Sequence, residues 1–168
     1  MLESGSIAPH FALPDQDGRT RTLVELLAAG PFLLYFYPAD FTPGCTRQAC
    51  AFRDLHPRLL DLGLRVLGIS PQAPDSHRRF REQYALPFDL LSDVDKAVIR
   101  LYDVDGPFGF GVRRASLLLD ADGVIRDGVL ADLRIAQHEE FIRNALAVAE
   151  RERSAGRLAA PHDAEAPQ

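Results

Sequence analysis

Residues 35–54 have the sequence YFYPADFTPGCTRQACAFRD, and they contain both cysteines of the chain, Cys45 and Cys50. The apolar run that ends here, residues 32–37, predicts a buried strand. A turn at residues 42–44, Thr-Pro-Gly, separates this strand from a helix that carries Cys45 in its first turn. The predicted order is therefore strand, turn, helix, with a thiol at the start of the helix.

The position of Cys45 predicts a reactive thiol. The first turn of a helix has unpaired amide hydrogens and the positive end of the helix dipole, and both favour an anion. The favoured anion is the thiolate, which is the nucleophilic form of cysteine. A structural disulfide with Cys50 is the alternative, but a 168-residue domain does not need one and the cytosol disfavours it. A chemical role therefore explains the two cysteines better than a structural disulfide does.

The spacing Pro38-x-x-x-Thr42-x-x-Cys45 resembles the peroxiredoxin signature, in which a proline and a threonine precede a peroxidatic cysteine. Cys50, five positions later, resembles the resolving cysteine of the bacterioferritin comigratory protein group, also called peroxiredoxin Q. The likeness extends over residues 5–146. It implies an atypical two-cysteine peroxidase with a thioredoxin-like fold.

The resemblance implies a catalytic cycle. Cys45 reduces hydrogen peroxide or an organic hydroperoxide and becomes a sulfenic acid, and Cys50 then condenses with it to an intramolecular disulfide. A thioredoxin-like or glutaredoxin-like donor reduces that disulfide. For the peroxide, we expect donors from the amides of Gly44 and Cys45 and from the hydroxyl of Thr42.

An arginine is expected opposite the thiolate, because a guanidinium stays charged and can hydrogen-bond to both peroxide oxygens. The family has this arginine in an Arg-x-Ser/Thr pattern just before a strand. Arg114-Ala115-Ser116 matches that pattern, and Arg113 misses it by one position. From the residues alone, Arg114 is better explained as an exposed side chain at a strand edge; the resemblance reverses this and favours it for the site. Arg53 is expected to pair on the helix surface.

The other segments predict an α/β domain. The expected elements are a β-hairpin over residues 7–22, a helix over 23–29 capped by Thr22, a helix from 43 to about 62, a strand over 64–70, a helix capped by Asp75 or Ser76 and ending at Tyr84, a short strand within 87–93, a helix over 96–102, an irregular loop over 105–111, a β-hairpin over 114–130 and a helix over 137–153. A strand–helix–strand unit predicts parallel pairing. The order predicts a thioredoxin-like fold, a mixed sheet with helices on both faces and an N-terminal β-hairpin. We expect one domain over residues 1–153 and a disordered tail over 154–168.

Composition excludes several classes of function. A net charge of −5 argues against a nucleic-acid-binding protein. The longest apolar stretches have the length of strands, and the first residues lack the features of a signal peptide, so we expect no membrane span and a cytoplasmic location. Two cysteines and five scattered histidines do not form a zinc motif, and no flavin, nicotinamide or haem motif is present. We expect no metal or cofactor, and a monomer, with a dimer left open.

Two alternative functions remain open at this point. A thiol-disulfide oxidoreductase of the same fold normally has two residues between its cysteines, whereas this chain has four. A non-catalytic chaperone or redox-sensing module is the other alternative. Steady-state peroxide consumption with thioredoxin distinguishes this module from the enzyme.

The spacing of the cysteines also predicts motion. On one regular helix, five residues give a rise of about 7.5 Å and a Cα separation of about 8.6 Å. A disulfide requires a Cα separation below about 7 Å. The helix must therefore unwind locally when Cys45 and Cys50 form a bond.

Overall fold

The computed structural model describes residues 1–154, with side chains described through residue 151. The elements are β1 (Ala12–Pro14), β2 (Thr20–Thr22), α1 (Leu23–Ala28), β3 (Phe32–Phe36), α2 (Pro43–Asp61), β4 (Arg65–Ser70), α3 (Pro74–Tyr84), β5 (Asp89–Ser92), α4 (Ala97–Leu101), a 3-10 turn η1 (Pro107–Gly109), β6 (Ala115–Leu119), β7 (Ile125–Leu130) and α5 (Ile135–Ser154). The predicted α/β order is confirmed.

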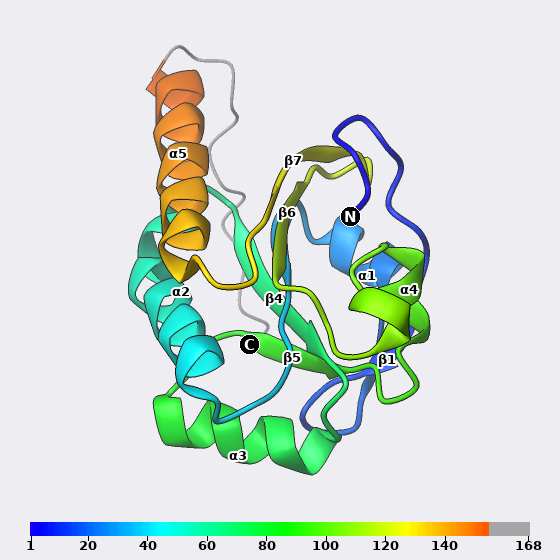
Figure 1. Cartoon of the computed structure of the whole chain (residues 1–168). Coiled ribbons are helices and arrows are strands. Elements are labelled where there is room, and N and C mark those ends of the chain that lie inside the picture. The colour runs from blue at the N-terminus through cyan, green and yellow to red at the C-terminus, as the bar shows by residue number, and fades with distance from the viewer. Residues whose placement is uncertain (155–168) are drawn as a thin grey trace, which may run out of the picture.

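Five strands form a mixed sheet in the order β5-β4-β3-β6-β7. The strand pairs β3–β4 and β4–β5 are parallel, whereas β6 runs antiparallel to β3 and β7 antiparallel to β6. Helices α2 and α5 lie on one face of the sheet, and α1 and α4 lie on the other (Figure 1). Every residue of β3 is buried, as expected for a strand with neighbours at both edges and helices on both faces.

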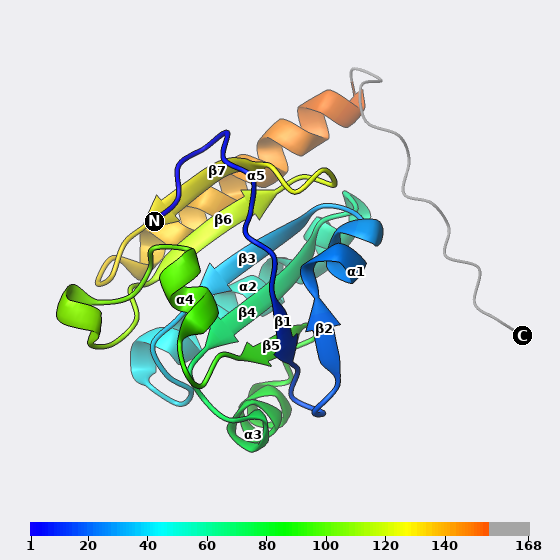
Figure 2. The ribbon, with the colours of Figure 1, turned by 90° about the vertical axis from the view of Figure 1, so that its right-hand side faces the viewer.

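The N-terminal β-hairpin is confirmed, with β1 and β2 antiparallel. It lies against the β5 edge, where Asp15 forms a bridge with Leu91 (Figure 2). The predicted cap of α1 is also confirmed: Thr22 Oγ1 accepts from the Glu25 amide at 3.2 Å, and Glu25 Oε2 accepts from the Thr22 amide at 3.0 Å. This reciprocal pair satisfies two amide hydrogens at the helix start.

Alternation along β3 divides the core between the two faces. Phe32, Leu34 and Phe36 belong to the cluster beneath α1 and α4, whereas Leu33 and Tyr35 belong to the cluster beneath α2 and α5. The Tyr35 ring contacts Phe52 of α2 edge to face, with ring centroids 4.8 Å apart. Such a pair adds about 0.5–1.5 kcal/mol to the burial of the two rings. This contact fixes α2 on the sheet.

One prediction at a helix start, the cap of α3, was wrong. α3 begins at Pro74 after Ala73, and no side chain caps it, because proline suits the first helical position and the Ser76 hydroxyl has another partner, Asp40. α5 begins at Ile135 instead of Gln137. The predicted disordered tail, residues 154–168, lies outside the described residues except for Ser154, which ends α5.

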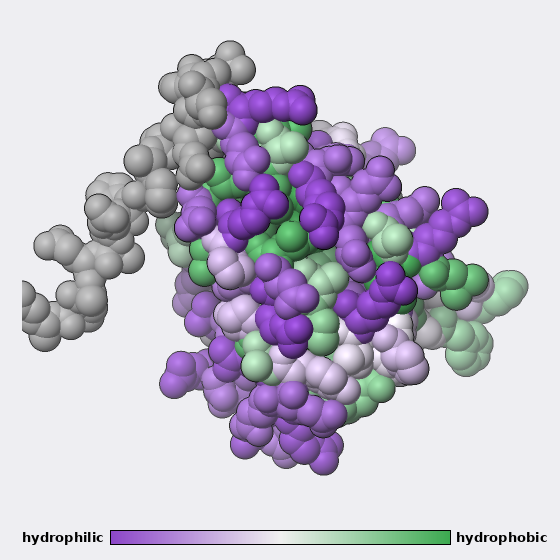
Figure 3. Space-filling model, turned by 90° about the vertical axis from the view of Figure 1, so that its left-hand side faces the viewer, coloured by the Kyte–Doolittle hydropathy of each residue, from purple (hydrophilic) through white to green (hydrophobic). Residues whose placement is uncertain are grey.

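The surface over α2 and α5 carries mostly hydrophilic side chains, with apolar side chains between them (Figure 3). Among residues 1–154, no helix has the length and apolar character needed to cross a membrane.

Candidate active site

Cys45 lies in the first turn of α2, directly after the loop that follows β3, and its residue is only 1% exposed. Pro43 occupies the first helical position, where its missing amide hydrogen costs nothing. Thr42 is the residue before the helix, but its hydroxyl does not cap the helix; it donates to the Ala39 carbonyl at 3.2 Å. The predicted strand, turn and helix with a thiol in the first turn are therefore present.

The structure brings Arg114 to Cys45. Arg114 Nη2 lies 3.4 Å from Cys45 Sγ, and Arg114 is 6% exposed. Arg113 points elsewhere: its side chain is 41% exposed and its Nε lies 3.2 Å from Asp132 Oδ2. Of the two arginines, Arg114 alone contacts the thiol within the described part of the chain.

Gln48 holds the guanidinium from the other side. It is fully buried on α2, one turn after Cys45, and its Oε1 accepts from Arg114 Nη1 at 2.6 Å. The Arg114 backbone amide donates to Asp132 Oδ1 at 2.8 Å, and its Nε donates to the Asp132 carbonyl at 3.4 Å. Gln48 was missed by the sequence analysis, although its spacing of three from Cys45 places it on the same face of a helix.

Gly44 lies where the guanidinium approaches the helix. A Cβ at this position would be 3.2 Å from Arg114 Nη2 and 3.2 Å from Ile135 Cδ1, closer than most real Cβ contacts. The absence of a side chain at Gly44 therefore allows Arg114 to reach the first turn of α2. The role predicted for Gly44, an amide donor to the peroxide, remains a prediction.

Cys50 lies on α2 as well, with a free thiol that is partly exposed. It lines a pocket of about 320 Å³ between α2 and α5. The other lining residues are Arg47, Ala51, Asp54, Leu55, Glu139 and Arg143. Both cysteines lie on one continuous helix. A disulfide between them therefore requires the helix to unwind locally.

Pro38 and Arg53 complete the predicted set. Pro38 is partly buried in the loop after β3, seven positions before Cys45. Arg53 pairs with Asp54 at 2.9 Å and donates to the Tyr84 carbonyl at 2.9 Å. The predicted surface pairing of Arg53 is confirmed.

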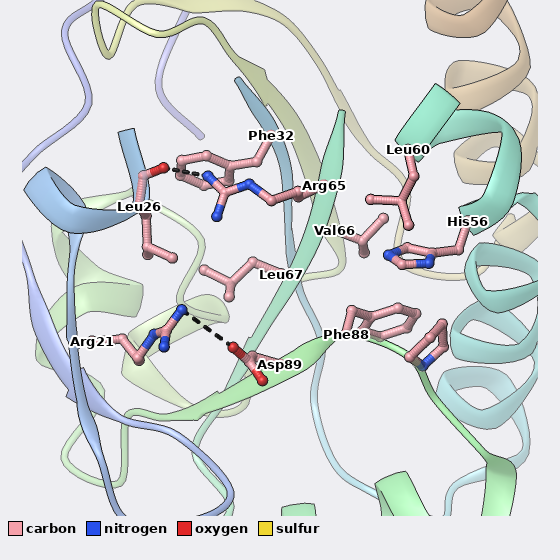
Figure 4. A pocket seen from close by; sticks show the side chains of 11 residues that line it. Arg21, Leu26, Phe32, His56, Leu60, Arg65, Val66, Leu67, Phe88 and Asp89 are labelled. Atoms are coloured by element: carbon pink, nitrogen blue, oxygen red, sulfur yellow. Dashed lines mark hydrogen bonds and ion pairs between the residues drawn. The ribbon is translucent and has the colours of Figure 1, made fainter. Parts of the chain in front are cut away.

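A separate pocket of about 300 Å³ lies at the opposite end of the sheet, where β3, β4 and β5 begin (Figure 4). Its cations already have protein partners: Arg21 pairs with Asp89 at 3.5 Å, and Arg65 donates to the carbonyl of Leu26 at the end of α1. None of the predicted site residues lines this pocket, so it is distinct from the Cys45 site.

Comparison with known proteins identifies the family. The sequence profile of the AhpC/TSA family matches residues 4–127. The chain belongs to the AhpC/TSA family. The chain is 42% identical over 151 residues to Peroxiredoxin Bcp of Escherichia coli strain K12. The alignment covers 86% of this chain and 96% of that relative. It is 43% identical over 126 residues to the chloroplastic Peroxiredoxin Q of Gentiana triflora, over 74% of this chain and 58% of the relative.

Solved structures of AhpC/TSA relatives agree. Peroxidoxin BcpB of Mycobacterium tuberculosis matches with a TM-score of 0.81 and 33% identity, over 90% of this chain and 98% of the relative. A Peroxiredoxin Q structure from Xanthomonas campestris matches with a TM-score of 0.74 and 30% identity. The match covers 82% of this chain and 90% of that structure. The predicted peroxiredoxin of the bacterioferritin comigratory protein group, its thioredoxin-like fold and its thiol-dependent peroxidase activity are confirmed.

Proposed function

We propose that this peroxidase reduces hydrogen peroxide and organic hydroperoxides with Cys45 as the peroxidatic thiol. The observation that supports it most is the 3.4 Å approach of Arg114 Nη2 to a Cys45 Sγ that is almost fully buried. A cation at this distance favours the thiolate, and a guanidinium has enough donors to hydrogen-bond to sulfur and peroxide together. The inclusion of organic hydroperoxides is supported by a relative at 30% identity, the Xanthomonas campestris bacterioferritin comigratory protein, whose structure is described with alkyl peroxide reduction activity.

In the first step the Cys45 thiolate attacks one peroxide oxygen, the O–O bond breaks, and a sulfenic acid forms. The other oxygen leaves as hydroxide or alkoxide and takes up a proton. Its developing charge needs donors. Gly44 and Cys45 are in the first turn of α2, where amide hydrogens have no partner within the helix. We assign stabilisation of the leaving oxygen to these amides and to Arg114; the Thr42 hydroxyl, which donates to the Ala39 carbonyl, accepts a hydrogen bond from the peroxide.

In the second step the Cys50 thiol condenses with the sulfenic acid, releasing water and forming the Cys45–Cys50 disulfide. A dithiol donor of the thioredoxin or glutaredoxin type then reduces this disulfide and is itself oxidised. Cys50 is suited to this role because it is partly exposed beside a surface pocket. An intramolecular disulfide needs no second chain, so we propose a monomer. We propose the cytoplasm as its location, since a reducing compartment can recycle the pair.

Stopped-flow peroxide consumption with thioredoxin, thioredoxin reductase and NADPH tests the assignment. We expect Cys45→Ser to abolish turnover with hydrogen peroxide and with cumene hydroperoxide. Cys50→Ser should undergo one oxidation and leave a sulfenic acid that dimedone labels at Cys45. Labelling at Cys50 in the intact enzyme, with none at Cys45 in Cys50→Ser, would show that the two roles are reversed.

A further inference from the structure

A buried hydrogen-bonded pair, Asp40 and His77, joins α3 to the loop that leads to Cys45. Asp40 belongs to the loop between β3 and α2, and His77 belongs to α3. Both side chains are 0% exposed. His77 Nδ1 is 3.0 Å from Asp40 Oδ2 and 3.2 Å from Asp40 Oδ1. No local sequence pattern marks either residue.

Further hydrogen bonds surround the pair and hold both side chains in place. His77 Nε2 lies 3.2 Å from the Leu91 carbonyl, which only accepts, so Nε2 carries a hydrogen. Asp40 accepts from the Tyr37 hydroxyl at 2.8 Å and from Ser76 Oγ at 2.6 Å. Burial raises the pKa of Tyr37 well above its usual value, which keeps that phenol a donor. The contact between His77 Nδ1 and Asp40 Oδ2 contains one hydrogen, and this hydrogen bond links the loop to α3.

The next loop residue, Phe41, also packs against α3. Its φ is +61°, in the left-handed region that bulky residues rarely adopt. Its ring packs against Phe80 and Tyr84 of α3, with centroids 5.2 and 6.4 Å away. A strained backbone persists only where its surroundings hold it in place. Asp40 and Phe41 are therefore two consecutive residues that α3 holds in one conformation.

This anchored segment leads directly into the reactive helix turn. Phe41 adjoins Thr42, the residue before α2, and Cys45 follows within the first turn. The first turn must be wound for Cys45 to face Arg114, and it must unwind for Cys45 to reach Cys50. The position of the loop therefore contributes to the balance between these two conformations.

We propose that His77 is a positioning residue: through Asp40 it anchors the loop to α3 and favours the wound conformation, in which Cys45 faces Arg114. The inference rests on the proposed roles of Cys45 and Cys50. Loss of the Asp40–His77 contact should therefore change the two steps of the reaction in opposite directions. Loss of the anchor slows the reaction of Cys45 with peroxide, because the wound conformation is less populated. It speeds the formation of the disulfide, because the unwound conformation is more populated.

Rapid-quench mass spectrometry tests the proposal by following the sulfenic acid and the disulfide separately after reduced protein is mixed with hydrogen peroxide. For His77→Gln we expect oxidation of Cys45 to slow by about tenfold or more, the scale of effect that misplacing a reacting group produces. We expect disulfide formation to be faster than in the wild type. In Asp40→Asn/His77→Gln, which replaces the buried carboxyl together with its partner, thermal stability should recover relative to His77→Gln.

The matched control is His56→Gln. His56 is a second buried histidine, 7% exposed on α2, whose ring lies 5.9 Å from Phe88 in the pocket at the other end of the sheet. Both rate constants should match the wild type in this variant. Ser76→Ala removes one donor to Asp40 and keeps the Asp40–His77 contact, so both rate constants should change in the same directions by smaller factors. This variant serves if His77→Gln does not fold.

A lowered melting temperature in His77→Gln with both rate constants unchanged would overturn the proposal and leave the pair a purely structural one. Slowing of both steps together would overturn it too, since it assigns the steps opposite signs. Failure of the proposed function gives a different result: wild-type protein whose first oxidation product is not on Cys45.

Discussion

Arg114 and Cys45 are 69 positions apart in the sequence, yet Arg114 Nη2 lies 3.4 Å from Cys45 Sγ. The sheet explains this proximity. Cys45 follows the carboxyl end of β3, and Arg114 precedes the amino end of β6, the antiparallel neighbour of β3. Both residues therefore emerge at the same end of the sheet, where Gln48 completes the contact with the guanidinium.

Arg114→Ala should lower the second-order rate constant for peroxide by about 10²-fold to 10³-fold, the loss typical of removing a donor from a developing oxyanion. Alkylation of Cys45 by iodoacetamide at neutral pH should slow as well, because the nearby cation favours the thiolate. Stopped-flow and alkylation kinetics measure the two effects. Arg113→Ala is the control, since an exposed pair such as Arg113–Asp132 contributes at most about 1 kcal/mol. Equal alkylation rates in wild type and Arg114→Ala would remove Arg114 from the site.

Gln48→Ala should lower both stability and activity. It removes the acceptor of Arg114 Nη1 in a buried position, at a cost of about 1–3 kcal/mol in the free energy of unfolding. The guanidinium loses one of its fixed contacts, so the peroxide rate constant should fall by about tenfold. Gln16→Ala is the control, because Gln16 is buried and hydrogen-bonded to the Leu90 amide at the hairpin. A fall in stability for both variants with no difference in peroxide rate would contradict a role for Gln48 in the site.

Formation of the Cys45–Cys50 disulfide should unwind the first turns of α2. The two Cα atoms are about 8.6 Å apart on a regular helix, and a disulfide needs less than about 7 Å. Amide hydrogen exchange across residues 43–54 should be faster in the oxidised protein than in the reduced protein, while β3 stays protected. Equal protection in both forms, with the intramolecular bond confirmed by mass spectrometry, would rule this out.

His138 should make stability depend on pH. It is fully buried; its Nε2 donates to the Ala131 carbonyl at 3.0 Å and its Nδ1 accepts from Ser116 Oγ at 2.9 Å. Burial lowers the pKa of His138, and nearby Arg114 lowers it further, against the opposing effect of the Ala131 carbonyl. The unfolded chain takes up this proton near pH 6.5, and the folded protein does so only at lower pH. The contribution of neutral, buried His138 to the free energy of unfolding is therefore complete above about pH 6.5 and is lost as the pH falls below that value.

Urea unfolding between about pH 4.5 and 7.5 checks this prediction. His138→Gln should flatten the curve in the acid range. Burial also lowers the pKa of His56, so some slope should remain until His56→Gln is added. An unchanged curve in the double variant would show that these histidines do not control acid stability.

The parts of the site that the sequence predicts are those with fixed local spacing. Cys45, Thr42 and Gly44 lie within one turn and helix start, and Arg114 belongs to a short pattern before a strand. Asp40 and His77, 37 positions apart, meet only because α3 packs beneath the loop. No local pattern specifies that contact. The same packing explains the wrong cap for α3, since the Ser76 hydroxyl bonds to Asp40 instead of its own helix.

The pairing of Phe36 with Ala115 has a consequence for how the chain can vary in length. If the rest of β6 keeps its pairing with β3, a single-residue deletion within β6 moves the preceding residues forward by one position, so that Arg113 takes the place of Arg114. An added residue near the tip of the loop over 105–111, where Phe108 is 99% exposed, leaves that pairing untouched. Insertions and deletions are therefore tolerable at that loop and inactivating a few positions later.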